Sequence, residues 1–375
     1  MDVPFDVIKI ISSYIVKPRI KLLDWINMCN LHGPFLAQNP NAIQILEQHK
    51  WMTYSYQLFP YLSKNPNAID LLEANSEKIT WDFVCGNPNA YRLWEANLDK
   101  INWTILSRNH NAIKLLEKNI DKINWEELSR NHNAIELLEN NIDKINWEIL
   151  SGNPNAIKLL ENNIDKINWN MLSSNPNAIR LLEKNTDKID WAKLSKNPNA
   201  IHIIEENLTN IMDKINWGWL SINPNAIHIL ENNIDKINWM GITLNPNGCQ
   251  LIEVNLDKVN WNLFSRYSNA IHILEANQDK IQWGELSKNP NAINILEANQ
   301  RKVSWTYLSL NPNIFEPDTE CYNTEILKKA HKLENYINDY SGSKMSHVVD
   351  IVDKIHSIHS YAKSNIDINS LCILS

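Results

Sequence analysis

Apolar residues recur along most of this chain in two short blocks that return together about every 22 residues. In residues 153–174 the first block reads AIKLL, and its apolar side chains fall on one face of a helix. Trp169 and Leu172 form the second block, and their spacing of three also places them on one helix face. The pattern predicts two short antiparallel helices in each unit. Such short helices are unstable alone, so each unit must stack on its neighbours.

The residues around the two blocks predict where each helix begins and ends. Asn153 is a good N-cap, and Pro154 suits the first helical position. We expect this helix to end at Asn162-Asn163, because asparagine tolerates the left-handed conformation common at helix ends. Asn168 begins the second helix. Equivalent positions elsewhere hold the capping residues Thr80, Asp190 and Ser304, a capping-box partner at Glu127, and the weaker Gln282.

One tryptophan per unit marks a tandem repeat. Successive members are 22 residues apart, except for one interval of 26. We expect these indoles to be buried, each removing about 150–250 Å² from water, and to join neighbouring units into one hydrophobic spine. The set is Trp81, Trp103, Trp125, Trp147, Trp169, Trp191, Trp217, Trp239, Trp261, Trp283 and Trp305.

Asn-X-Asn tracts define about thirteen units. Two intervals, 39 to 65 and 197 to 223, are 26 residues long. Because four residues make about one helical turn, we expect an extended first helix there, from Ile201 to Met212 in the second case. Phe59 takes the tryptophan position in the early unit. The tracts begin at Asn39, Asn65, Asn87, Asn109, Asn131, Asn153, Asn175, Asn197, Asn223, Asn245, Asn289 and Asn311, with Tyr267-Ser268-Asn269 as a degenerate copy.

These features predict an all-α fold: a right-handed-type α-solenoid of about thirteen 22-residue helix-turn-helix repeats with helical caps at both ends. The expected divisions are an N-terminal helical cap or F-box-like segment at 1–38, the solenoid at 39–313, and a C-terminal helical cap at 314–375. Within this cap we expect a helix in 314–340, a break at 341–343 and a second amphipathic helix. A leucine-rich repeat has a similar period, but it needs its apolar residues arranged around a strand.

Composition and charge narrow the classes of function. The 375 residues carry a net charge of −7, with acids and bases interspersed, so there is no basic stripe for nucleic acid. No apolar run is long enough to cross a membrane, and the first residues lack a signal-peptide cleavage site. The scattered cysteines favour reduced thiols in an intracellular setting over disulfides or a zinc site. They are Cys29, Cys85, Cys249, Cys321 and Cys372.

Several polar rows are copied from unit to unit, whereas a catalytic group needs one special environment. We expect surface salt bridges between an acidic and a basic row, each worth about 0–1 kcal/mol, and serines that bond free carbonyls or amides at helix junctions. No glycine-rich phosphate loop or G-x-S-x-G motif is present, so we predict no catalytic residue, cofactor or metal. The acidic row includes Glu117, Glu139, Glu161 and Glu183, and the basic row includes Lys122, Lys144, Lys166 and Lys188.

Positions that vary between units are free to carry specificity. One variable track follows Ala-Ile in the first helix, and the other directly precedes each Asn-X-Asn tract. We expect both tracks to face solvent and one of them to line a partner-binding surface. The candidate residues are Lys114, Lys158, Arg180, His202, His228 and His272 on the first track, and Arg108, Arg130 and Lys196 on the second.

Histidines invite a separate interpretation. His202 and His228 belong to adjacent units and could form a metal-binding or pH-sensing pair, and His356 and His359 lie three apart near the C-terminus. No acid at fixed spacing and no third ligand is evident in the sequence, so we interpret them as solvated surface histidines.

The repeated segments NPNAIKLLE, NIDKINW and L-S-x-N-P, over roughly residues 39–313, resemble the short helical tandem-repeat proteins of giant DNA viruses of the mimivirus type. That resemblance implies an α-solenoid in an infected host cytoplasm, with virion association as an open alternative. It implies no activity.

The first thirty residues are weakly similar to the start of an F-box. The apolar-proline start and the following apolar spacing carry the similarity, through Val3, Pro4, Ile8 and Ile11. The resemblance implies a partner, the linker subunit of a cullin ubiquitin ligase, with the repeat array selecting the substrate. A plain helical cap explains the same spacing.

We therefore expect a non-enzymatic repeat protein that binds a protein partner along an extended solenoid face, and the F-box-like start suggests a role as an adaptor for a host ubiquitin ligase. The alternative is a structural or scaffold component of a giant-virus particle or factory. No membrane partner is expected, and the acidic balance disfavours nucleic acid.

Overall fold

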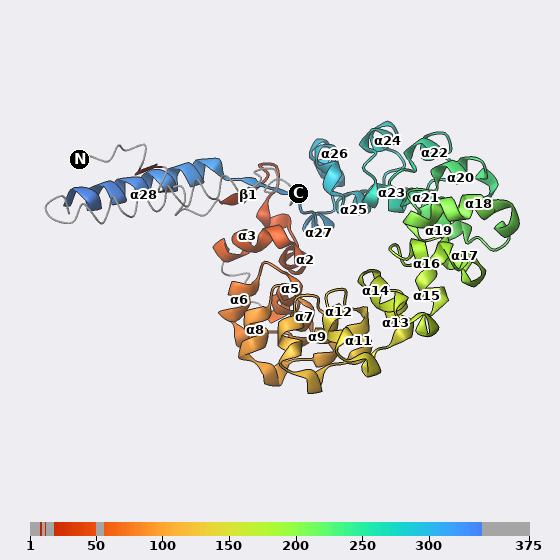
Figure 1. The fold of residues 1–375 in the computed structure, drawn as a ribbon. Helices are drawn as coiled ribbons and strands as arrows, with labels where there is room; N and C mark the ends of the chain where they lie inside the picture. Colours follow the sequence, from red (N-terminus) through yellow and green to blue (C-terminus); the bar gives the residue numbers. More distant parts are fainter. Residues whose placement is uncertain (1–7, 10–11, 13–18, 50–55, 340–375) are drawn as a thin grey trace. The chain divides into compact units, whose positions relative to one another are not determined.

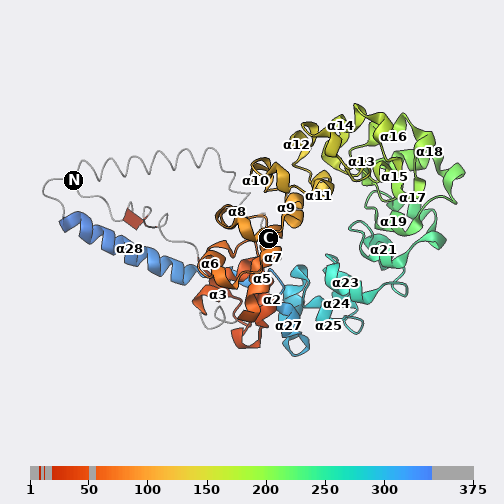
Figure 2. The same cartoon turned by 90° about the horizontal axis from the view of Figure 1, so that it is seen from below.

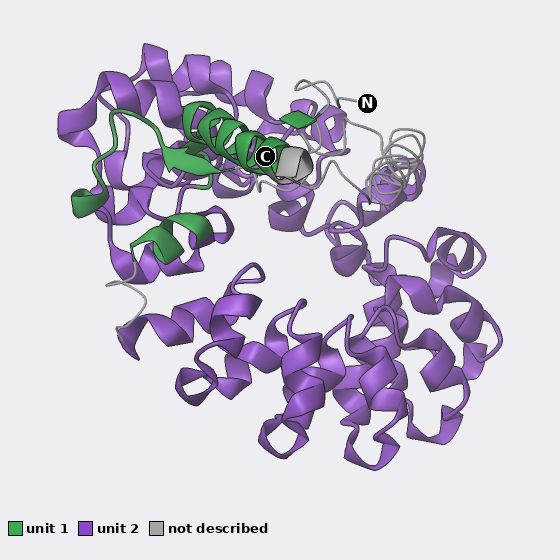
Figure 3. Ribbon diagram, turned by 90° about the vertical axis from the view of Figure 1, so that its left-hand side faces the viewer, with its two compact units in different colours: residues 1–30, 44–49, 312–375 green, residues 31–43, 50–311 purple. Residues whose placement is uncertain are grey.

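The computed structural model describes residues 8–9, 12, 19–49 and 56–339, with side chains described as far as residue 335. The chain divides into two compact units, coloured separately in Figure 3. Unit 1 contains residues 1–30, 44–49 and 312–375, and unit 2 contains residues 31–43 and 50–311. The helical repeat array belongs to unit 2.

Unit 2 is an all-α solenoid built from units of about 22 residues, as the apolar pattern predicts (Figure 1). Each unit contributes a first helix, which follows the Asn-X-Asn tract, and a second helix that begins at the tryptophan, which we call the Trp helix. The first helices are α6 (Ile69–Glu73), α8 (Tyr91–Ala96), α10 (Ile113–Glu117), α12 (Ile135–Glu139), α14 (Ile157–Glu161), α16 (Ile179–Glu183), α18 (Ile201–Ile211), α20 (Ile227–Glu231), α22 (Cys249–Glu253), α24 (Ile271–Ala276) and α26 (Ile293–Ala298).

The Trp helices of successive units pack beside one another along most of the array. They are α7 (Trp81–Gly86), α9 (Trp103–Arg108), α11 (Trp125–Arg130), α13 (Trp147–Ser151), α15 (Trp169–Ser173), α17 (Trp191–Leu194), α19 (Trp217–Ile222), α21 (Trp239–Thr243), α23 (Trp261–Tyr267), α25 (Trp283–Leu286) and α27 (Trp305–Leu308). At the N-terminal end of unit 2, α2 (Gly33–Gln38) and α5 (Phe59–Lys64) take the same place, and Phe59 begins its helix as predicted.

A short 3-10 turn joins the two helices in most units, so the prediction of two helices per unit was incomplete. In residues 153–174 this turn is η9 (Ile164–Lys166), and a second one, η8 (Pro154–Ala156), precedes α14. The first helix ends without a left-handed residue, contrary to our expectation: Asn163 has φ −138°. Instead its side-chain amide donates to the Leu159 carbonyl at 2.9 Å, which satisfies a free group of the last turn.

The start of each Trp helix is capped in most units. Asn168 accepts from the Met171 amide at 3.0 Å, and Asp190 caps in the same way. Gln282 makes no side-chain cap, as expected of the weakest start. Thr80 and Ser304 also make none, which contradicts the prediction.

The capping box expected at Glu127 is half formed. The Asn124 side chain accepts from the Glu127 amide at 3.1 Å, but the Asn124 amide donates to Ser107 Oγ of the preceding unit at 3.0 Å. Since the serine has satisfied that amide, Glu127 is left to pair with Arg130. The serine row therefore links consecutive units, beyond the local role predicted for it.

The 26-residue interval at 197–223 is absorbed by a longer first helix. Helix α18 runs from Ile201 to Ile211, with Met212 as its C-cap, which confirms the extended helix. Register is preserved, because Asn223 still bonds to the preceding tract at Asn197. In the earlier interval, α3 (Ile43–Gln48) and η3 (Tyr56–Leu58) flank residues 50–55, which lie outside the described part of the chain.

Leucine and alanine form the continuous core, and the tryptophans lie at its edge. Leu160 and Leu172 are fully buried, as are their equivalents in neighbouring units, and Ala156 is buried with them. The eleven repeat tryptophans are only half-buried, so the predicted indole spine was wrong. The tryptophan occupies the first position of its helix, at the margin of the unit, whereas the residue three positions later points into the core.

A ladder of buried asparagines holds the units together. The side-chain amide of Asn153 donates to the carbonyls of Ser129 (3.1 Å) and Asn131 (3.2 Å) in the preceding unit, and its side-chain oxygen accepts from the Asn155 amide. The same set recurs at the other tracts. At the degenerate tract, Ser268 accepts from the Ala270 amide but has no side-chain amide to donate.

The last unit of the array bonds to the first as though it were the preceding copy. Asn39 donates to the carbonyls of Ser309 (3.2 Å) and Asn311 (2.9 Å), and the His32 amide donates to Ser309 Oγ at 2.8 Å. These bonds match those between consecutive units elsewhere, and all four residues belong to unit 2. The array therefore closes on itself, so Leu31–Gln38 supplies a Trp-helix equivalent to the solenoid.

Unit 1 combines a small strand pair with a long helix, visible in Figures 1 and 2. Strand β1 (Ile20–Leu22) pairs antiparallel with β2 (Phe315–Pro317), an element the apolar pattern did not predict. Helix α28 (Thr319–Asp339) confirms the helix expected in 314–340, and η1 (Met28–Asn30) is a 3-10 turn. The break at 341–343 and the second C-terminal helix lie outside the described residues.

Candidate functional site

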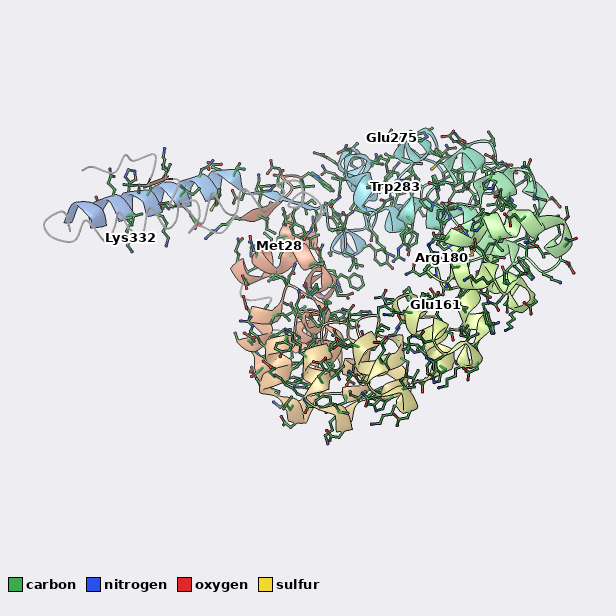
Figure 4. The ribbon with its side chains drawn as sticks, in the orientation of Figure 1. Met28, Glu161, Arg180, Glu275, Trp283 and Lys332 are labelled. Atoms are coloured by element: carbon green, nitrogen blue, oxygen red, sulfur yellow. The ribbon has the colours of Figure 1, made fainter. Side chains whose placement is uncertain are left out.

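The first variable track is exposed in every unit from Lys114 to Asn294, as predicted. Its three histidines reach back to the acidic row of the preceding unit. His202 lies 2.9 Å from Glu183, His272 lies 2.8 Å from Glu253, and His228 contacts Glu205. The expectation that no acid accompanies these histidines was therefore wrong, because the acid comes from the neighbouring unit. Figure 4 labels Arg180 and Glu161, which hold the corresponding positions of two successive units.

The basic row does not pair with the acidic row, contrary to our prediction. Lys144 Nζ instead lies over the Trp125 ring, 4.7 Å from its centroid, and Lys166 and Lys188 lie at the same distance over the preceding tryptophans. Each lysine comes from the 3-10 turn of one unit and covers the indole of the unit before. The half-buried indole face explains the preference, since it attracts a cation.

The second track occupies the last positions of the Trp helices. Arg108, Arg130 and Lys196 are exposed there, in agreement with the prediction, while Lys288 and Leu310 are half-buried. Arg130 pairs with Glu126 (3.9 Å) and Glu127 (3.7 Å) of its own helix. These are exposed ion pairs of small energetic value.

Two residues of this track are apolar and exposed, and an exposed methionine lies beside them. Ile222, Met240 and Leu244, which we call the apolar patch, have exposed fractions of 44%, 58% and 39%. Met240 and Leu244 lie four residues apart on one face of α21. Ile222 on α19 lies against the same helix, because a Cβ placed on Gly241 would be 3.2 Å from its Cγ1. Ile222 therefore lies beside α21, next to the residue that follows Met240.

Basic residues flank the apolar patch on both sides. Lys196, Ile222, Leu244 and Arg266 hold the same position in four successive units, so the row reads basic, apolar, apolar, basic. Lys193 Nζ lies 4.9 Å from the ring centroid of Trp219, which is three residues before Ile222. Lys196 makes no ion pair with any other residue that the structure describes, and Arg266 shares Glu285 with Lys288. An apolar centre with a charged rim is the usual anatomy of a protein-binding surface.

A second group was not anticipated from the sequence. His110 and His132 replace the proline of two successive tracts, and their ring centroids lie 5.0 Å apart. The signal was present in the sequence, because both residues follow the tract asparagine in adjacent units.

The described residues contain no group of three or more His, Cys, Asp or Glu side chains that could hold a metal ion. Within the same residues, no helix is long and apolar enough to cross a membrane. Cys29, Cys85, Cys249 and Cys321 are free thiols. Cys85 takes the serine place and accepts from the Asn102 amide, and its burial raises the pKa of the thiol.

Most of the F-box-like positions lie outside the residues that the structure describes. Ile8 is buried, whereas Val3, Pro4 and Ile11 lie outside the described residues, as do His356 and His359. Comparisons of the chain with protein-family models, curated proteins and solved structures found no match.

Proposed function

We propose that this chain is a non-enzymatic repeat protein that binds another protein, with the apolar patch as the centre of its contact surface. The observation that carries the proposal is the exposure of Ile222, Met240 and Leu244 on the adjacent helices α19 and α21 and at the C-terminal end of α21. The other members of the second track are arginine, lysine, serine or glycine, apart from Leu310, which is half-buried. Contiguous apolar surface on a soluble array is costly to leave in water and is typical of an interaction site.

The internal comparison between units supports this choice of face. The residues that are the same in most units have structural roles. The asparagines and serines form hydrogen bonds between units, and the leucines fill the core. These positions are buried or bonded, so they cannot contact a partner. The two variable tracks remain, and the apolar patch is the least polar exposed segment beside them.

The charges beside the apolar patch indicate what kind of partner it suits. Lys196 on one side and Arg266 on the other favour carboxylates. The expected partner segment therefore carries two or three apolar side chains flanked by Asp or Glu. Apolar contacts at the centre would supply most of the affinity, and the rim charges would speed association.

A cross-linking experiment tests the proposal. A photoreactive amino acid at position 240 should trap a partner protein in cells that express the chain, and Ile222→Asp with Leu244→Asp should abolish the product. The matched control is Ile120→Asp, since Ile120 is 43% exposed, close to Ile222 at 44%, but lies on a different face. A product that survives the paired aspartates, or no product at position 240, would contradict the proposal.

A structural or scaffold role is the second candidate, and a different observation favours it. Leu98, Ile120, Ile142 and Ile164 hold the same position in four successive units and are each 42–48% exposed. Such a row could join copies of the chain side by side. Concentration-dependent mass by light scattering tests this role: Ile120→Asp with Ile142→Asp should abolish self-association, and a wild-type chain that stays monomeric would exclude it.

A further inference from the structure

His110 and His132 form a close pair on the surface of unit 2. Both imidazoles are exposed, and their rings are tilted by 50° with centroids 5.0 Å apart. Ten other Asn-X-Asn tracts carry proline at this position. Because the two substitutions fall in adjacent units, the repeat brings the two rings together.

The hydrogen bonding around Asn131 fixes the tautomer of His110. The Asn131 amide nitrogen donates to the carbonyls of Ser107 and Asn109, and its oxygen accepts from the Asn133 amide. The oxygen is thus an acceptor, so His110 Nδ1, which lies 3.1 Å from it, must carry the hydrogen and donate. In the neutral ring, Nε2 of His110 therefore carries no hydrogen, and its lone pair is the one that could bind a ligand.

This is the arrangement that prepares histidine for metal binding. A ring that donates its other N–H to a fixed oxygen is held in orientation and made more basic at the free nitrogen. Arg108 and Arg130 directly precede the two tracts. Arg130 is paired with Glu126 and Glu127.

We propose that His110 and His132 together bind one divalent transition-metal ion, with water completing its coordination. Metal–nitrogen bonds of about 2.0–2.1 Å at a tetrahedral angle put two imidazole centres about 5 Å apart, and the observed separation is 5.0 Å. Two imidazole ligands suit Cu²⁺, Ni²⁺ and Zn²⁺, whereas Mg²⁺ and Ca²⁺ prefer oxygen. With two protein ligands the site is open, so affinity should be moderate and follow the order Cu²⁺ above Ni²⁺ and Zn²⁺.

The array itself supplies the variants for the test. His110→Pro and His132→Pro each restore the residue carried by most other tracts, so the fold should tolerate them. His202→Asn is the matched control, because His202 is an exposed histidine paired with Glu183. Calorimetric titration of the full chain with Ni²⁺, Cu²⁺ and Mg²⁺ at pH 7.5 gives the affinity and stoichiometry.

We expect one saturable Cu²⁺ or Ni²⁺ site per chain, no Mg²⁺ binding, and at least a tenfold loss of affinity in each proline variant, with the His202→Asn variant unchanged. The Cu²⁺ electron paramagnetic resonance spectrum should show two nitrogen ligands in the wild type. Binding that is unchanged in both proline variants, or a wild type without a saturable site, would overturn the proposal. Neither result depends on the protein-binding role of the apolar patch.

Discussion

The side-chain amide of Asn39 donates to the carbonyl of Asn311 at 2.9 Å, across 272 residues of chain. The same bond joins neighbouring tracts, as between Asn153 and Asn131. Closure therefore needs no special interface. It follows from a small rotation between units that adds up until the last unit meets the first, where the ordinary bonds between units form once more. A closed array leaves neither terminal face of its core exposed, which open arrays must cover with polar caps.

Replacing a ladder asparagine should destabilise the protein strongly. Asn153→Ala leaves the buried carbonyl of Ser129 and the amide of Asn155 without their partner, at about 1–3 kcal/mol for each group. We expect a loss of about 2–4 kcal/mol in the free energy of unfolding, measured by urea denaturation.

Asn155→Ala is the control for this ladder prediction. Asn155 also bonds to the preceding unit, through the His132 carbonyl at 2.9 Å, but it is exposed, so water can replace it. Its loss should cost less than about 1 kcal/mol. If Asn153→Ala and Asn155→Ala lowered the free energy of unfolding equally, burial of the hydrogen bonds would not explain the stability of the ladder.

The sequence predicted the elements that depend on local spacing. Period, helix type, the cap at Asn168 and the long helix at Ile201 all follow from residues within one or two turns of each other. It did not predict relationships between units. The Asn153 ladder, the Asn39 closure and the lysines over indoles depend on which surfaces stacking brings together, and a one-dimensional pattern does not contain that geometry.

The candidate site shows the same division. The second variable track was found because its residues differ between copies, and most of its residues are exposed. The importance of Met240 was missed, because it lies outside both tracks and joins Ile222 only across the α19–α21 contact. The strand pair of Ile20–Leu22 was missed for a related reason, since its partner lies near residue 316.

The lysines over the tryptophans should stabilise the array measurably. Lys144→Met keeps the aliphatic stem but removes the charge 4.7 Å from the Trp125 ring. We expect a cost of about 0.5–1 kcal/mol, measured by urea denaturation at low and high salt.

Lys122→Met provides the comparison for that measurement. Lys122 is 55% exposed and pairs with Asp121 at 3.2 Å, and within the described residues it lies over no ring. Such an exposed pair contributes little, and salt screens it further. A larger effect at Lys122 than at Lys144 would show that the indole contact is not the stabilising one.

The histidine pair predicts a dependence of stability on pH in the absence of metal. Burial, then the charge of His110, lower the pKa of His132 in the folded state. The unfolded chain therefore binds more protons near pH 6, so stability is fully present above the ordinary histidine pKa and falls as pH decreases. Melting temperature should drop between about pH 7 and pH 5, and His132→Pro should reduce that drop. An unchanged slope in this variant would assign the pH dependence to other groups.

The closing seam should loosen without unfolding the array. At the seam, Ser309 accepts from the His32 amide and Asn39 bonds to the last tract, while Phe35 stacks on Tyr307 at 6.2 Å. Removing both polar links with Ser309→Ala and Asn39→Ala should make this junction open more often, because no continuous chain joins its two sides. The pairing of β1 with β2 is unchanged in this variant, so we expect helicity and the radius of gyration from X-ray scattering to persist while amide exchange quickens at His32.

An interior pair distinguishes opening from simple destabilisation. Ser151 accepts from the Asn168 amide at 2.9 Å, and Asn175 bonds to Ser151 and Asn153, so Ser151→Ala with Asn175→Ala removes the same bonds where the chain is continuous. This pair should lower the free energy of unfolding with a smaller rise in amide exchange at Asn168, because the connecting chain keeps the two units in place. If amide exchange quickened equally at His32 and at Asn168, the seam would open no more readily than an interior junction.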